Sequence, residues 1–408
     1  MNNVLRRKRR VSQLDYSFSD RVQALKPSAI REIFKYASDP GVISLSAGNP
    51  APEAFPAKEI AEISADLFAQ NPIDLLQYSV TEGYTPLRET IAGSMRKKHR
   101  VGREFDRVLV TSGAQQVMDL AAKSLCNEGD VVLCEAPSFI GALNTFRSYN
   151  ARLRGISLED DGMNMEELER ALKEETRVRF IYTIPNFQNP AGVTMSMEKR
   201  RRLYALAKQY GTLILEDNPY GDLRFHGEHV EAVKSLDEDG IVIYAGSFSK
   251  VIAPGMRVGY AIAPQELIQK MVVCKQGQDV HTNIWAQRVC CELMTRYDFD
   301  AHLERLRGVY RKKYKTAMDA ISRFFPERVT CRPVEGGLFL WCTLPEGADM
   351  PAFCRQAVLR KVCVVPGSAF LPNENDPCRS FRINYSSPTD EQLVKGIEIL
   401  GQLAKESC

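Results

Sequence analysis

The sequence predicts an α/β fold, with a seven-stranded and mainly parallel sheet in a large domain and a smaller α+β domain beside it. Three observations carry this prediction. The chain of 408 residues is long enough for two domains and a large core. Short, nearly continuous apolar runs are typical of strands that are buried on both faces. These runs alternate with helical segments, as they do in a layered α/β domain.

Composition and charge describe an ordinary globular protein, with 44% hydrophobic and 26% charged residues. The net charge of +3 is small for this length and gives no reason to expect a nucleic-acid partner. No apolar stretch approaches the roughly 18 residues that would indicate a membrane span, so we expect no membrane partner. The 11 cysteines contain no C-x-x-C pair, which favours reduced thiols in the cytoplasm. The five histidines form no metal signature, and we expect no metal site.

The N-terminal part is predicted to complete the small domain. The basic run at 6–10 is interpreted as part of a solvated tail, with a nucleic-acid or membrane-surface arm as the alternative. Apolar positions recur at helical spacing from 21 to 36, and a short strand after them ends in a turn at Gly48. The expected division is a flexible basic tail at 1–18, a large domain at 61–280, and a small domain made of 19–60 and 281–408.

The large domain carries the regular alternation of strands and helices. Strands are expected at 107–111, 130–134, 152–156, 178–183, 212–216, 241–245 and 258–263. Helices are expected between them at 114–126, 165–175 and 197–210. The small domain is expected to hold a long helical region at 285–324, a strand pair within 332–344, a helix at 351–360, strands at 362–365 and 381–385, and a final helix at 389–405.

Polar or small residues follow the predicted strands, where ligands bind in parallel sheets. Gly113, Ala114 and Gln115 open a helix, whose backbone N–H groups suit a phosphate, although this segment taken alone favours an ordinary helix cap. Phe139 follows the second strand and is suited either to stacking on a flat heterocycle or to the core. Asn189 offers an amide in a turn that Pro and Gly residues would also explain.

Two further strand ends carry charged groups. Asp217 ends a buried strand, where a carboxylate is costly unless it meets a cation such as a pyridinium N–H. Tyr220 lies three residues on and can donate a hydrogen bond to a phenolate oxygen. Lys250 follows another apolar run, and a desolvated lysine loses its proton readily and becomes a nucleophile toward aldehydes.

The residues around this lysine suit a phosphate. Ser247 and Ser249 offer hydroxyl donors, and Arg257 offers a fork of N–H groups. Tyr78, in a polar and aromatic loop, is either another phosphate donor or a packing residue. An aldehyde that carries a phosphate describes pyridoxal 5′-phosphate (PLP), and the gathering of these groups at one sheet edge favours the functional interpretation.

With these motifs in place, the chain from about residue 20 onward resembles PLP-dependent enzymes of fold type I, specifically the aminotransferase class I and II family. The likeness is carried by Asn-Pro-x-Gly at 189–192, Asp-x-Pro-Tyr at 217–220, and Ser-x-Ser-Lys at 247–250 followed by an arginine. The segments at 44–50, 76–78 and 336–341 are most similar to the subgroup of 2-aminoadipate, kynurenine and broad aromatic aminotransferases.

The resemblance implies a role for each site residue. Lys250 would bind the cofactor aldehyde covalently and later move the substrate proton, and Asp217 would pair with the pyridine nitrogen. Asn189 and Tyr220 would hold the phenolate oxygen, and Phe139 would stack on the ring. The phosphate would be held by Gly113, Ala114, Gln115, Ser247, Ser249 and Arg257, with Tyr78 reaching in from the second subunit of a homodimer. Arg382 would clamp the substrate carboxylate, with Gly48, Asn189 and Phe339 around the substrate.

The implied activity is ping-pong transfer of an amino group from an L-amino acid to 2-oxoglutarate. The expected donors carry aromatic, 2-aminoadipate-like or other large side chains. A lyase or synthase of the same fold, and a PLP-binding sensor module without turnover, are the alternatives. Two positions depart from the family pattern. Phe139 stands where tyrosine is common, and Asn218 stands where the subgroup is expected to have a second aspartate.

Overall fold

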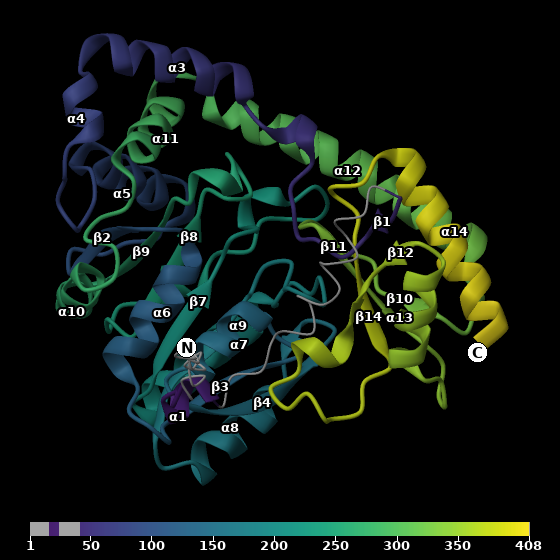
Figure 1. Cartoon of the computed structure of the whole chain (residues 1–408). Helices are drawn as coiled ribbons and strands as arrows, with labels where there is room; N and C mark the ends of the chain where they lie inside the picture. The colour runs from purple at the N-terminus through teal and green to yellow at the C-terminus, as the bar shows by residue number, and fades with distance from the viewer. Residues whose placement is uncertain (1–15, 24–40, 408) are drawn as a thin grey trace, which may run out of the picture.

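The computed structural model describes residues 16–23 and 41–407 of the chain (Figure 1). The basic run at 6–10 and most of the helix predicted at 21–36 lie outside these residues. The described part of the predicted range overlaps one short helix, α1 (Asp20–Gln23).

The largest element is an eight-stranded sheet with the order β2-β9-β8-β7-β6-β3-β4-β5. Its strands are β2 (Asp106–Thr111), β3 (Val131–Ala136), β4 (Arg152–Glu159), β5 (Gly162–Met163), β6 (Val178–Thr183), β7 (Leu213–Asp217), β8 (Val242–Ser247) and β9 (Gly259–Pro264). Each of the seven predicted strands overlaps one of them, and the eighth is the two-residue edge strand β5. The strands from β8 through β4 are parallel, while β9 is antiparallel to both of its neighbours.

Helices cover both faces of this sheet, as the continuous apolar strands require. Side chains alternate along β3, so that Val131 and Leu133 face one layer and Val132 and Cys134 face the other. The first layer contains α8 (Met165–Glu174) and α9 (Met197–Tyr210). The second contains α6 (Ala114–Leu125) and α7 (Ile140–Arg147). The core is therefore split by the sheet into two apolar layers.

The remaining helices surround this unit and connect it to a second sheet. They are α3 (Ala57–Gln70), α4 (Pro72–Leu76), α5 (Thr85–His99), α10 (Gln265–Gln276), α11 (Ile284–Arg296), α12 (Phe299–Phe324), α13 (Met350–Leu359) and α14 (Asp390–Ser407). The second sheet has the order β10-β11-β14-β13, formed by Thr330–Cys331, Phe339–Thr343, Ser380–Asn384 and Val365–Pro366. Two short parallel strands, β1 (Ile43–Ser44) and β12 (Val362–Cys363), form a third, two-stranded sheet.

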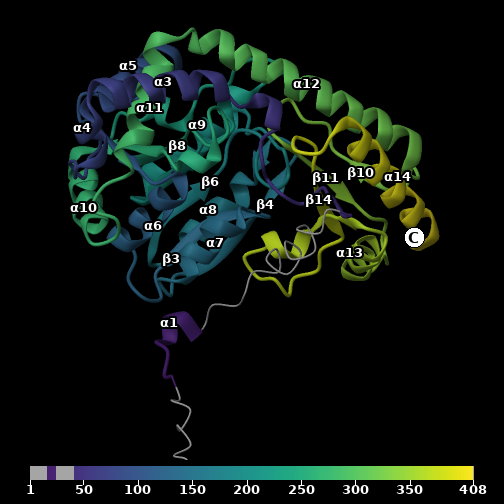
Figure 2. The same cartoon turned by 45° about the horizontal axis from the view of Figure 1, so that its top comes forward.

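Helix α12 spans the molecule from the large sheet to the second one, as both views show (Figures 1 and 2). The sequence predicted one long helical region at 285–324, and this prediction is wrong in one respect. The region is divided into α11 and α12, because the Asp298 carboxylate accepts a hydrogen bond from the Ala301 N–H and starts a new helix. The domain boundaries themselves stay a prediction.

Two features of the described residues bear on membrane spans and on disulfides. Among the helices of the described residues, none is long and apolar enough to cross a membrane. The cysteines in the described part of the chain are free thiols.

Candidate active site

A cavity of about 430 Å³ lies at the carboxyl ends of the central strands. All the site residues predicted from the sequence line it, except Gly113 and Tyr78. The volume is in the range of small-molecule sites, and the position is the one expected for an open α/β sheet. The structure therefore brings together side chains that are up to about 330 residues apart in the sequence, from Gly48 to Arg382.

One end of the cavity is a cradle for an anion. Gly113 precedes α6 with a positive φ of 81°, and the Nη2 of Arg257 lies 2.3 Å from where a Cβ on this glycine would stand. Arg257 donates to the Ser249 Oγ at 3.4 Å and to the Ser112 carbonyl at 3.2 Å. The Ser247 Oγ accepts from the Ser249 N–H. A helix N-terminus, two hydroxyls and a guanidinium thus surround one point, which fits a phosphate group.

Lys250 lies three residues beyond the end of β8, and its Nζ donates to the Gly48 carbonyl at 2.9 Å. Burial lowers the pKa of this lysine to about 8, and the charges of Arg382 and Arg257 act in the same direction, while Asp217 opposes them. The amine is therefore neutral at a lower pH than an ordinary lysine, as a nucleophile toward an aldehyde must be.

Asp217 ends β7 and is buried. Its Oδ2 accepts a hydrogen bond from the Tyr182 hydroxyl at 2.8 Å, while its Oδ1 is buried and has no partner among the described residues. Burial raises the pKa of Asp217 to about 7, although Tyr182 and Lys250 lower it. A buried oxygen without a donor is costly. A pyridinium N–H supplies a donor and a positive charge, so the residues of this site fit PLP.

The opposite wall holds Arg382, which is buried in β14. Its guanidinium lies 4.2 Å from the centre of the Phe339 ring and 4.9 Å from that of Phe370. The Nη1 donates to Asn189 Oδ1 at 2.8 Å and the Nη2 donates to the Ser46 carbonyl at 2.6 Å. The Nε is buried and lacks a partner among the described residues, which suits a guanidinium that receives a carboxylate.

Three residues next to the cavity were not identified from the sequence. Tyr182 orients Asp217 from the neighbouring strand, and Phe370 completes the aromatic sandwich on Arg382. Glu135 is buried and accepts hydrogen bonds from Thr183 and from the Ile184 N–H. A carboxylate in an apolar run was the one local signal that could have found Glu135. The other two depend on which strands and loops are neighbours.

The two departures from the family pattern are placed differently. Phe139 lines the cavity, and its role in stacking on the cofactor ring stays a prediction. Asn218 is absent from the lining, and its amide accepts from Asn186 at 2.9 Å and donates to the Tyr244 hydroxyl at 3.0 Å. This asparagine therefore belongs to a polar network beside the site.

Tyr78 does not reach the cavity of its own chain. Its side chain is 81% exposed, and its ring makes an edge contact with His281 at 5.9 Å. Within one chain the predicted phosphate contact is therefore not formed, and it stays a prediction for the homodimer.

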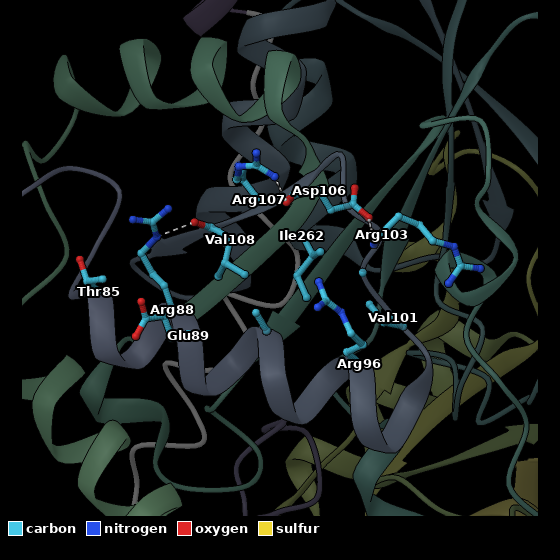
Figure 3. Close-up of a pocket in the computed structure, with 12 residues that line it drawn as sticks. Thr85, Arg88, Glu89, Arg96, Val101, Arg103, Asp106, Arg107, Val108 and Ile262 are labelled. Carbon is cyan, nitrogen blue, oxygen red and sulfur yellow. Dashed lines mark hydrogen bonds between the residues drawn. The ribbon is translucent and has the colours of Figure 1, made fainter.

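A second cavity, of about 200 Å³, lies between α5 and the first residues of β2, away from the carboxyl ends of the central strands (Figure 3). Its arginines are largely bound to the protein itself. Arg88 donates to the Val108 carbonyl at 2.9 Å, and Arg107 donates to the Asp106 carbonyl at 2.7 Å (Figure 3). This cavity carries none of the predicted site residues.

The sheet order defines the class of protein, together with a half-buried lysine just beyond β8 and a carboxylate oxygen on β7 that has no partner among the described residues. It is a PLP-dependent enzyme of fold type I. A model of the family "Aminotransferase class I and II" matches residues 40–400, and the chain belongs to this family. It is therefore a PLP-dependent aminotransferase, as the resemblance implied.

Relatives agree with this assignment and with the expected subgroup. The aromatic-amino-acid aminotransferase 1 of Thermococcus litoralis is 39% identical over 98% of this chain and 98% of its own length. A solved structure of Pyrococcus horikoshii kynurenine aminotransferase in complex with PMP is 36% identical, with a TM-score of 0.92 over 95% of this chain and 97% of that one. LysN, the α-aminoadipate aminotransferase of Thermus thermophilus, complexed with N-(5′-phosphopyridoxyl)-L-leucine, is 36% identical with a TM-score of 0.87 over the same shares.

Proposed function

We propose that this aminotransferase moves the amino group of an L-amino acid with an aromatic, 2-aminoadipate-like or other large side chain to 2-oxoglutarate, by a ping-pong mechanism. One observation carries the proposal. The Lys250 amine, the free Oδ1 of Asp217 and the sandwiched guanidinium of Arg382 face one cavity. The names of the relatives supply the substrate classes.

The residues divide the work by chemistry. Arg382 binds the substrate carboxylate and so fixes how the α-carbon lies relative to Lys250. The neutral Lys250 amine takes the proton from that carbon and returns it later, as a general base and acid. Asp217 holds the charge of a ring nitrogen, and Phe139, Asn189 and Tyr220 hold the ring. When PLP is bound, it supplies the electron sink and carries the amino group between the two half-reactions.

The apolar part of the cavity supports large side chains in the substrate. Met118, Ile140 and Ile184 line it beside Phe139, and none of them was singled out in the sequence. Apolar walls bind aromatic and long aliphatic groups by removing their surface from water. The acceptor 2-oxoglutarate carries a second carboxylate in its side chain. Its use by this enzyme is part of the proposal.

We further propose a homodimer in which Tyr78 enters the partner's cavity and meets the cofactor phosphate. Three apolar residues close to this tyrosine in the sequence, Ile73, Leu76 and Val80, are each more than half exposed. Clustered apolar side chains on a surface mark interaction sites. We also propose that the chain is divided into two domains at residues 60 and 280. The free thiols favour a cytoplasmic location, which we propose as well.

The test is a panel of amino donors offered with 2-oxoglutarate to the PLP-loaded protein, with detection of the 2-oxo acid formed. Aromatic and 2-aminoadipate donors are expected to give the highest kcat/KM. The Lys250→Ala variant is the control and should give no turnover and no covalent cofactor. Turnover by Lys250→Ala, or release of ammonia in place of glutamate, would contradict the proposal.

A further inference from the structure

The backbone just after Lys250 is hydrogen-bonded to a side chain of helix α12. The His302 Nε2 lies 2.6 Å from the carbonyl oxygen of Val251, the residue that follows Lys250. Arg305, one turn further along α12, donates from its Nη2 to the His302 Nδ1 at 3.2 Å. Because a guanidinium can only donate, Nδ1 is an acceptor and the hydrogen of the ring is on Nε2. His302 is therefore neutral, and it donates to the Val251 carbonyl.

Arg305 continues the chain of contacts to a second segment of the site. Its Nη1 donates to the Glu53 carbonyl at 2.6 Å and its Nη2 donates to the Ala54 carbonyl at 3.0 Å. These residues follow Gly48, whose carbonyl accepts the hydrogen bond from the Lys250 amine. The segment at 48–54 is thus bonded to the lysine directly at one end and through α12 at the other.

We propose that His302 and Arg305 are positioning residues, which hold the segment at 48–54 and the lysine loop in register so that the Lys250 amine stays at its place in the cavity. The inference rests on the proposed function, since it concerns the group that moves the substrate proton. Neither residue lines the cavity, so both act through the backbone.

Two features of its surroundings favour the hydrogen bond from His302 to the Val251 carbonyl. The His302 ring is stacked on Phe299 with a centroid distance of 5.7 Å and an interplanar angle of 28°, which fixes the plane of the ring. Burial lowers the pKa of His302, and the charge of Arg305 adds to this effect, while the bond to Val251 and the charge of Glu59 oppose it. The neutral ring that the contact needs is thus favoured by its surroundings.

The test compares four variants of the full chain. His302→Phe removes the donor and keeps a ring, while His302→Gln keeps an N–H donor of similar reach. Arg305→Met removes the guanidinium and keeps an apolar stem. Arg323→Met, in the last turn of the same helix, is the matched control. Circular dichroism and thermal unfolding establish that each variant folds, and if His302→Phe does not fold, Arg305→Met carries the same test.

The first readout needs no turnover. In the cofactor-free protein, acetylation of Lys250 is followed against pH by mass spectrometry of its peptide. For His302→Phe and Arg305→Met, the midpoint is expected to move upward, toward that of an ordinary lysine, because the displaced amine is less desolvated and lies farther from Arg382 and Arg257. His302→Gln and Arg323→Met should keep the wild-type midpoint.

The second readout is steady-state kinetics of the PLP-loaded protein. His302→Phe and Arg305→Met are expected to lower kcat by about three- to tenfold, the effect of one lost hydrogen bond, with little change in KM. A wild-type midpoint and kcat in both variants would overturn the proposal, and so would equal damage in His302→Gln and His302→Phe. A shifted midpoint in a protein without aminotransferase activity would refute the proposed function and leave the positioning contact standing.

Discussion

Burial of the Lys250 amine, together with two cationic side chains and one carboxylate near it, sets the pH at which it can react. Arg382 and Arg257 add to burial in lowering the pKa of the amine to about 8, and Asp217 opposes them. At neutral pH about one amine in ten is then unprotonated, against roughly one in a few thousand for an ordinary lysine. The site therefore prepares its nucleophile before any substrate arrives.

This pKa predicts the pH dependence of cofactor attachment. The rate at which the cofactor-free protein binds PLP covalently should rise with a midpoint near pH 8 and level off about one pH unit above it, because half of the Lys250 amine is neutral at its pKa and nearly all of it one unit higher. Stopped-flow absorbance against pH measures this rate. A rate that continues to rise through pH 10 would show that Lys250 titrates as an ordinary lysine.

Asp217 and Tyr182 give a second prediction at the same scale. Asp217→Asn keeps the shape of the side chain and removes the charge that holds a ring nitrogen protonated, so kcat should fall by about a hundredfold or more. Tyr182→Phe removes only the hydrogen bond to Oδ2 and should cost about three- to tenfold. Steady-state kinetics at saturating substrate measures both. If the tyrosine variant were the more damaged of the two, the role given to Asp217 would be wrong.

At the scale of elements, the junction of β2 and α6 carries the cradle that we propose for the cofactor phosphate. Gly113 has a φ that other residues rarely adopt, and the Arg257 guanidinium occupies the space where its Cβ would lie. A side chain at this position must displace the guanidinium from Ser249 and Ser112. The tight turn and the anion site are therefore one feature of the backbone.

Gly113→Ala is expected to weaken PLP binding by about tenfold or more, because the phosphate loses a correctly placed arginine. Gly102→Ala is the matched control, since Gly102 has a similar positive φ of 104° and open space where its Cβ would stand. Both variants should lose about 1–2 kcal/mol of stability to backbone strain. Absorbance titration with PLP gives the affinity, and thermal unfolding gives the stability. Equal PLP affinity in the two variants would contradict the cradle.

The sequence predicted the elements of the large sheet and the residues that follow its strands, because both are recorded in local patterns. Buried strands are apolar runs, and Asp217 ends one such strand while Lys250 lies three residues beyond another. Tyr182 and Phe370 could not be found in this way. Their contacts depend on β6 lying beside β7, and on the segment that follows β13 bringing Phe370 to Arg382, which no local pattern encodes.

At the scale of the whole molecule, α12 joins the two sheets and contacts the lysine loop at its start. Tyr78 is exposed on the surface of its own chain, as are Ile73, Leu76 and Val80, which are close to it in the sequence. A single chain therefore lacks one of the expected phosphate donors. In an isologous dimer each site would combine the Lys250 of one protomer with the Tyr78 of the other.

Subunit mixing tests this arrangement. Lys250→Ala should be inactive and Tyr78→Ala strongly impaired, and each alone damages both sites of its dimer. In a hybrid of the two, one site has Lys250 and Tyr78 both intact and the other lacks both. Random exchange makes half of the dimers hybrids, so a mixture should recover about a quarter of wild-type activity. If Tyr78 served its own chain, every site would carry one of the two lesions, and activity would stay at the sum of the separate variants.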